Sequence, residues 1–141
     1  MVILDTDVMT LLEWSASPEA QRLKDRLAML PVDQVRTTII SFEEQMRGWM
    51  SHLASKKKVA EQVKAYAKLR RFLDIYRRLL ILDFDERAAV EFVRLKKQLP
   101  RLKTMDLKIA AIALSQNVLL ISRNLRDFEQ VPGLQVEDWT K

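Results

Sequence analysis

The fold class is decided by the opening stretch of the chain, Met1-Val2-Ile3-Leu4-Asp5-Thr6-Asp7. Its short apolar run ends directly at an acid, and a helical pattern of apolar residues follows at once. Such a run, without alternating polar residues, is typical of a strand buried on both faces, as in a parallel sheet. Ligands of parallel α/β sheets bind beyond the carboxyl ends of the strands, which is where Asp5 would lie. Alternatively, Asp5 or Asp7 serves only as the N-cap of the following helix.

The length and composition indicate one domain, residues 1–141, with a sizeable core. The chain is 48% hydrophobic and 30% charged, as in soluble globular proteins. No segment approaches the roughly 18 consecutive apolar residues of a membrane span. The N-terminus lacks the basic and apolar regions of a secretory signal. We therefore expect a cytoplasmic protein that has no contact with a membrane.

The scarcity of three residue types excludes several classes of site. The chain has no cysteine and a single histidine, His52, so thiolate chemistry, disulfides and any mechanism that needs two histidines are excluded. Its two glycines cannot build a glycine-rich phosphate loop. The net charge of +5 permits a polyanionic partner without requiring one. Any chemistry must rely on carboxylates, hydroxyls, lysines and arginines.

Strands and helices are predicted to alternate along the whole chain. Predicted strands cover residues 2–4, 35–40, 79–84 and 117–122, with a short final strand at 135–139 that suits a sheet edge. This order predicts a three-layer α/β/α domain with a central, mostly parallel sheet of about five strands. A helix that is apolar nearly all round, from Leu107 to Leu114, should be central and buried.

Polar residues mark the starts of several predicted helices. Ser17 and Pro18 open the second helix, and Thr104 should cap the buried one. Ser41 with Glu44 three residues later fits a capping box, which gives Glu44 an ordinary structural role.

A long helix is predicted from residue 58 to about residue 80. One face carries apolar residues at helical spacing, and the other is basic. The run Lys56, Lys57 and Lys58 precedes it. We interpret most of these cations as a solvated face, with contact to a nucleic-acid backbone as the alternative.

Four acids occupy equivalent places relative to the predicted elements: Asp5, Glu44, Asp106 and Asp127. In a parallel sheet all would gather at one edge, where their charges would repel and raise one another's pKa unless a cation were bound. Hard oxygen ligands without His or Cys suit Mg²⁺ or Mn²⁺. Together with the basic surface, they favour a metal-dependent nuclease. Each acid can also be explained by the stabilisation it gives a helix N-terminus.

Four motifs in order resemble those of PIN-domain ribonucleases. They are Leu4-Asp5-Thr6-Asp7-Val8, Ser41-Phe42-Glu43-Glu44-Gln45-Met46-Arg47-Gly48, Asp106-Leu107-Lys108-Ile109-Ala110-Ala111 and Ser122-Arg123-Asn124-Leu125-Arg126-Asp127-Phe128. The closing stretch, residues 131–139, resembles the tail of VapC-type toxins within that family. The resemblance covers the whole chain and implies a Mg²⁺-dependent endoribonuclease of a toxin–antitoxin pair.

The resemblance also implies roles for single residues. Asp5 and Asp106 would be the principal metal ligands, and Asp127 would hold a second metal or orient the attacking water. Glu44 would complete the acidic cluster, since it stands four residues before Gly48 as the family's acid does. The implied secondary and RNA-contacting residues are Thr6, Asp7, Ser122 and Asn124, and Lys56, Lys57, Lys58 and Arg123.

One position departs from the family pattern, and the residue that fills the fourth acidic position is ambiguous. Asp7 stands where the family most often has Asn, and some members carry their fourth acid where Asn124 stands rather than at Asp127. The implied partners are an RNA substrate, a cognate antitoxin and a second copy of the chain in a homodimer. Two alternatives remain: a PIN nuclease that processes RNA without an antitoxin, and a PIN-like module that binds RNA or protein without cleaving it.

Overall fold

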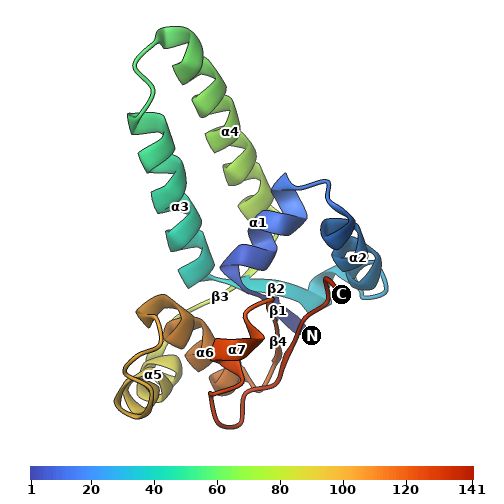
Figure 1. Ribbon diagram of the computed structural model, residues 1–141, viewed down its shortest axis with the longest axis vertical. Coiled ribbons are helices and arrows are strands. Elements are labelled where there is room, and N and C mark those ends of the chain that lie inside the picture. The colour runs from blue at the N-terminus through green and yellow to red at the C-terminus, as the bar shows by residue number, and fades with distance from the viewer.

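A five-stranded parallel sheet forms the centre of the computed structural model, which describes residues 1–141 (Figure 1). The strands lie in the order β3-β2-β1-β4-β5, and every neighbouring pair is parallel. Their bounds are β1 Val2–Leu4, β2 Val35–Thr38, β3 Leu80–Leu82, β4 Leu119–Ile121 and β5 Val136–Glu137. The predicted parallel sheet and its final edge strand are thereby confirmed.

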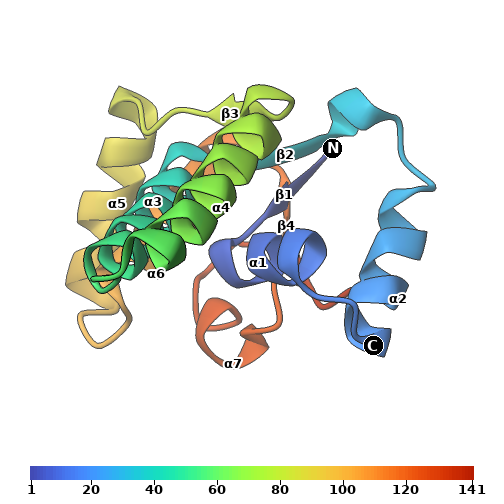
Figure 2. The ribbon, with the colours of Figure 1, turned by 90° about the horizontal axis from the view of Figure 1, so that it is seen from above.

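Seven helices surround the sheet: α1 Thr6–Trp14, α2 Pro18–Leu27, α3 Ile39–Ala54, α4 Val59–Arg77, α5 Glu86–Gln98, α6 Thr104–Gln116 and α7 Leu125–Phe128. A 3₁₀ turn, Val32–Gln34, precedes β2. α3 and α4 lie side by side in a hairpin that projects from the sheet, and α5 pairs with α6 at the opposite end (Figures 1 and 2). None of the helices combines the length and apolar character needed to cross a bilayer.

Two hydrophobic cores lie on opposite faces of the sheet, so the predicted three layers are confirmed. In β1, Val2 and Leu4 belong to the core under α1, α2 and α4, whereas Ile3 belongs to the core under α5, α6 and α7. A strand buried on both faces needs a continuous apolar sequence, which β1 has. Helix α6 is buried as predicted, with Leu107 and Ile109–Ala113 at most 1% exposed.

The start of α3 differs from the prediction. The strand ends at Thr38 rather than at residue 40, and Thr38 caps the helix by accepting a hydrogen bond from the Ser41 amide at 3.1 Å. Ile40 packs into a core from within the helix, so its β-branched side chain does not mark a strand. The proposed Ser41–Glu44 capping box is therefore wrong.

The start of α6 also differs from the prediction. Lys103 is its N-cap and makes no side-chain capping bond, so Thr104 is the first helical residue rather than the cap. Without a side-chain acceptor, this helix leaves its first amide groups open to other partners.

The apolar face predicted for the long helix is largely exposed. Val59, Val63, Tyr66 and Leu73 are each at least half exposed, whereas Tyr76 is buried. The outer turns of α4, which carry Val59 and Val63, extend beyond the sheet and have only α3 beside them (Figure 1). Leu73 instead lines an open groove that α4 forms with α3.

The Thr38 cap gives a stability prediction. Thr38→Val keeps the size of this fully buried side chain but removes the hydroxyl that accepts the Ser41 amide. We expect a loss of about 1–2 kcal/mol of unfolding free energy, measured by urea denaturation. Thr38→Ser, which keeps the acceptor, should lose less than Thr38→Val. Equal stability of wild type and Thr38→Val would show that the cap contributes nothing.

Candidate functional site

Asp5 is both the N-cap of α1 and the residue that follows β1, so its two interpretations are compatible. One carboxylate oxygen accepts the Val8 amide at 2.9 Å, and the other accepts the Ser122 hydroxyl at 2.5 Å. The residue is only 6% exposed. This burial raises the pKa of Asp5 to about 6, because the hydrogen bonds offset only part of the lost hydration, and the nearby charges of Asp7 and Asp106 raise it further.

Glu44 is held by the first residue of α1. The Thr6 hydroxyl donates to Glu44 Oε1 at 2.6 Å and lies 3.0 Å from the Ser41 hydroxyl. These contacts connect the N-terminus of α1 with the first turns of α3. Although Glu44 takes no part in a capping box, its carboxylate is thus held at the start of α1 by Thr6, the residue after Asp5.

Asp106 lies in the first turn of α6 and is half-buried. Burial is the largest cause that raises its pKa, followed by repulsion from Glu44, and Asp127 adds to this while Lys103 opposes it. Asp106 also raises the pKa of Asp5. Asp106 is therefore the acid that links the four predicted acids: Glu44 and Asp127 raise its pKa, and its own charge raises the pKa of Asp5.

A chain of hydrogen bonds joins the β4 end to Asp5. The Asn124 side-chain amide donates to Asp127 Oδ2 at 3.0 Å, and the Asn124 backbone amide donates to the Ser122 hydroxyl at 2.9 Å. Ser122 in turn donates to Asp5. The two candidates for the fourth position, Asn124 and Asp127, are thus hydrogen-bonded to each other.

Asp7, the departure from the family pattern, is held in an ion pair. Its two carboxylate oxygens accept Arg123 nitrogens at 2.7 and 2.8 Å, and Arg123 also reaches Glu19 at 2.9 Å. The bond to Asp7 raises the pKa of the guanidinium above its ordinary value. This contact between residues 116 positions apart was not predicted from sequence, and it ties the loop after β4 to α1 and α2.

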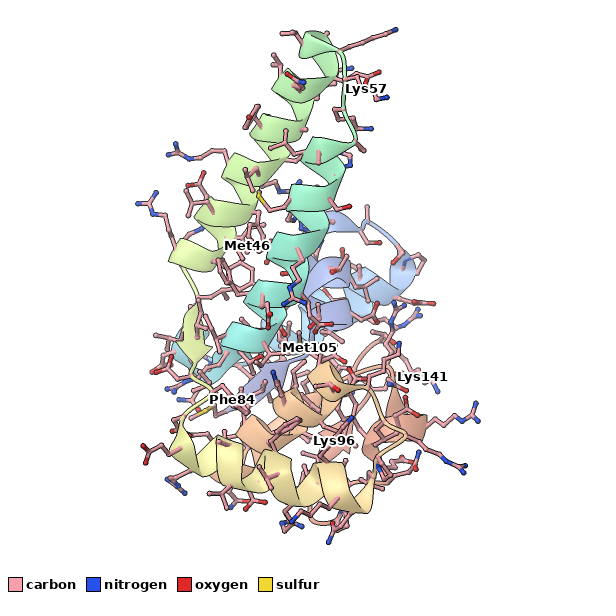
Figure 3. All side chains as sticks on the ribbon, turned by 90° about the vertical axis from the view of Figure 1, so that its left-hand side faces the viewer. Met46, Lys57, Phe84, Lys96, Met105 and Lys141 are labelled. Atoms are coloured by element: carbon pink, nitrogen blue, oxygen red, sulfur yellow. The ribbon has the colours of Figure 1, made fainter.

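The predicted lysine contacts lie apart from the acids. Lys56, Lys57 and Lys58 occupy the turn between α3 and α4. Figure 3 shows Lys57 at the far end of the hairpin from Met105, the neighbour of Asp106. An RNA that touched both sets would have to follow the length of the hairpin.

The four predicted acids are coupled through their charges, but their side chains do not yet form a metal site. No three acids or histidines lie close enough together to hold an ion. The donor set nevertheless suits a hard divalent cation, because all four predicted ligands offer carboxylate oxygens. The raised pKa values of Asp5 and Asp106 mark charges that a cation would stabilise.

Named relatives support the resemblance that the motifs predicted. The chain is 38% identical over 66 residues to the tRNA(fMet)-specific endonuclease VapC of Salmonella typhimurium, covering 44% of this chain and 50% of that protein. It is 39% identical over 70 residues to Ribonuclease VapC2 of Haemophilus influenzae, covering 47% and 53%. The matched part thus spans about half the length of these curated relatives.

Solved structures match over the full length. VapBC-1 from nontypeable Haemophilus influenzae superposes with a TM-score of 0.77 at 26% identity, covering 100% of both chains. A toxin–antitoxin complex from Klebsiella pneumoniae gives a TM-score of 0.71 at 26% identity, covering 99% of this chain and 98% of that one.

The sequence profile of the PIN domain matches residues 2–134. Since this match covers nearly the whole chain, the protein belongs to the PIN domain family.

Proposed function

We propose that this protein is a metal-dependent endoribonuclease and the toxin of a type II toxin–antitoxin pair. The observation that carries the proposal is the coupling of Asp106 to three further carboxylates at the end of the parallel sheet in a PIN domain. The names of the similar ribonucleases and toxin–antitoxin complexes support the same activity. The substrate would be RNA, and the partners would be an antitoxin and a second copy of the chain.

Asp5 and Asp106 would be the principal ligands of a Mg²⁺ ion, or of Mn²⁺, with Glu44 and Asp127 completing the cluster. Carboxylate oxygens without His or Cys are the donors that these ions prefer. A bound ion supplies positive charge for the negative charge that develops on a phosphoryl group during hydrolysis. Water would be the nucleophile, and cleavage would leave 5′-phosphate and 3′-hydroxyl ends.

The chain's own hydrogen bonds prepare this cluster. Val8 and Ser122 orient Asp5, Thr6 orients Glu44, and Asn124 orients Asp127. Partners of this kind fix the direction of ligand oxygens and reduce the rearrangement needed on binding. In each of Glu44 and Asp127 the named bond uses one oxygen and leaves the other for an ion or a water.

A binding module without catalysis is the weaker alternative, because a buried carboxylate such as Asp5 lowers stability and needs a reason to be kept. A PIN nuclease with no antitoxin remains the alternative within the enzymes. A small reading frame for a DNA-binding antitoxin beside this gene would favour the toxin over that alternative.

The central test is cleavage of a mixed structured RNA by the purified protein with Mg²⁺ and with EDTA. We expect metal-dependent cleavage, which Asp5→Asn and Asp106→Asn each reduce by roughly a hundredfold or more, as the removal of one stabilising group does in other active sites. Asp83→Asn, at an exposed acid after β3, is the matched control and should cleave normally. No cleavage by wild type, together with no Mg²⁺ binding in calorimetry, would favour the binding module.

Thr6 should affect activity through Glu44. Thr6→Val keeps the shape of the side chain but loses the hydroxyl that holds Glu44 Oε1. We expect cleavage to fall about 10- to 100-fold, the usual effect of removing the partner of a metal ligand, and Thr6→Ser to restore most of it. If Thr6→Val cleaves as wild type does at all Mg²⁺ concentrations, Thr6 has no positioning role.

The raised pKa of Asp5 predicts how stability depends on pH. Between pH 3.8 and about 6 the folded protein keeps a proton that the unfolded chain has already lost, so stability falls as the pH rises through this range. The shift corresponds to about 3 kcal/mol above pH 6. Asp5→Asn keeps an N-cap residue without this cost.

Urea unfolding in EDTA should therefore find Asp5→Asn more stable than wild type at pH 7.5, with the difference disappearing below pH 4. Added Mg²⁺ should narrow the difference at pH 7.5 by stabilising wild type alone. A wild type as stable as Asp5→Asn at pH 7.5 in EDTA would contradict the raised pKa.

A further inference from the structure

A groove of about 480 Å³ between α1 and α3 begins at the acidic cluster. Thr6 and Glu44 line it, as do Trp14, Trp49 and His52. An RNA strand bound at Glu44 would thus have the aromatic side chains of Trp14 and Trp49 within the same groove. The reaction proposed above does not use this part of the groove.

The aromatic side chains pack against one another and against Arg71 but remain partly exposed. The Trp14 and Trp49 ring centroids lie 4.6 Å apart with the planes tilted by 47°, and His52 meets Trp49 edge-on at 5.8 Å. The Arg71 guanidinium covers the Trp14 ring at 4.3 Å. Both tryptophans are half-buried, so each keeps surface that can contact a ligand.

Polar groups with fixed orientation lie beside these rings. The Gln45 amide donates to the Thr10 hydroxyl at 3.0 Å and accepts the Tyr76 hydroxyl at 2.5 Å. Thr10 and Gln45 both line the groove. The combination of aromatic faces with oriented hydrogen-bonding groups suits a flat ring that has polar edges.

Gly48 keeps the groove open. It lies within α3 and lines the groove, and a Cβ added there would meet nothing within 4 Å. A glycine inside a helix is less stable than an alanine would be there. Its φ is not positive, so the backbone does not require glycine. A larger side chain at position 48 would therefore occupy this open space.

We propose that this groove binds an unpaired base of the RNA, next to the nucleotide whose phosphodiester is cleaved, by stacking on Trp14 and Trp49. The inference rests on the proposed ribonuclease function and names how its substrate is held. Single-stranded RNA is commonly recognised by stacking of splayed bases on aromatic side chains. The substrate favoured at this site is therefore a loop or another unpaired segment.

A base suits this groove better than an apolar protein segment does. A second groove, on the other side of the α3–α4 hairpin, is lined almost entirely by apolar side chains, among them Phe42, Met46, Tyr66 and Leu73. Apart from Arg70, that surface offers an apolar partner only apolar side chains. The groove at Glu44 instead combines two indole rings with threonines and an amide.

The test fills the groove without weakening the helix. Gly48→Leu introduces a strong helix former into open space, so the variant should be at least as stable as wild type. Ala60→Leu adds a leucine at an exposed position of α4 that does not line the groove, and serves as the matched control. The substrates are a short single-stranded RNA and the same RNA with the base removed at each nucleotide flanking the cleaved bond.

We expect removal of one flanking base to lower kcat/KM about tenfold or more for wild type and Ala60→Leu, as the loss of a stacked base does elsewhere. Gly48→Leu should cleave the intact RNA about as slowly as wild type cleaves the abasic one, and base removal should not slow it further. Equal effects of base removal in wild type and Gly48→Leu would overturn the proposal. So would normal cleavage by Gly48→Leu with loss of binding to the antitoxin, which would assign the groove to a protein.

A binding measurement in EDTA separates this inference from the ribonuclease function. RNA should quench the tryptophan fluorescence of wild type and Ala60→Leu, and Gly48→Leu should need about tenfold more RNA for the same quench. If wild type cleaves no RNA but shows this pattern, the ribonuclease function fails and the stacking site stands. If Gly48→Leu is quenched as strongly as wild type, the stacking site fails whether or not RNA is cleaved.

Discussion

The burial of the Asp5 carboxylate is the constraint on which the rest of the site depends. One side chain caps α1, joins the ends of β1 and β4 through Ser122, and places a carboxylate where ions and substrates reach a parallel sheet. Its hydrogen bonds are all accepted by the carboxylate and favour the charged form, yet burial prevails and raises the pKa. The same position therefore organises the fold and carries a charge that the protein alone does not fully stabilise.

The topology explains why the other acids meet Asp5. β1 lies at the middle of the sheet, with β2 on one side and β4 on the other, and all three run in the same direction. The helices that follow β1 and β2 therefore begin at the same edge and bring Glu44 close to Thr6. The two cores hold these strands from both faces, so the positions of the acids depend on well-buried elements rather than on loops.

The sheet and most of the acidic cluster could be predicted from sequence because both follow from local patterns: continuous apolar runs, an acid directly after β1, and acids in the first turns of α6 and α7. Glu44 follows no such pattern, since the first turn of α3 has no acid. The start of α3 could not be predicted in this way, since burial of Ile40 in a core outweighs its local preference for a strand. Exposure of Val59 and Tyr66 depends on how far the hairpin projects, which no local pattern encodes. The Asp7–Arg123 pair joins distant residues and needs the folded chain to be seen.

The distribution of charge separates the two kinds of acid in this protein. Several acids on the surface have cations beside them: Arg123 binds Asp7 and Glu19, and Arg47 binds Glu43. The acids of the cluster have hydroxyls and amides instead, and Lys103 is the cation that opposes the raised pKa of Asp106. Surface pairs of this kind add little stability. A protein of net charge +5 thus leaves the carboxylates of the cluster without a salt bridge at the end of the parallel sheet, which is where ligands of such sheets bind.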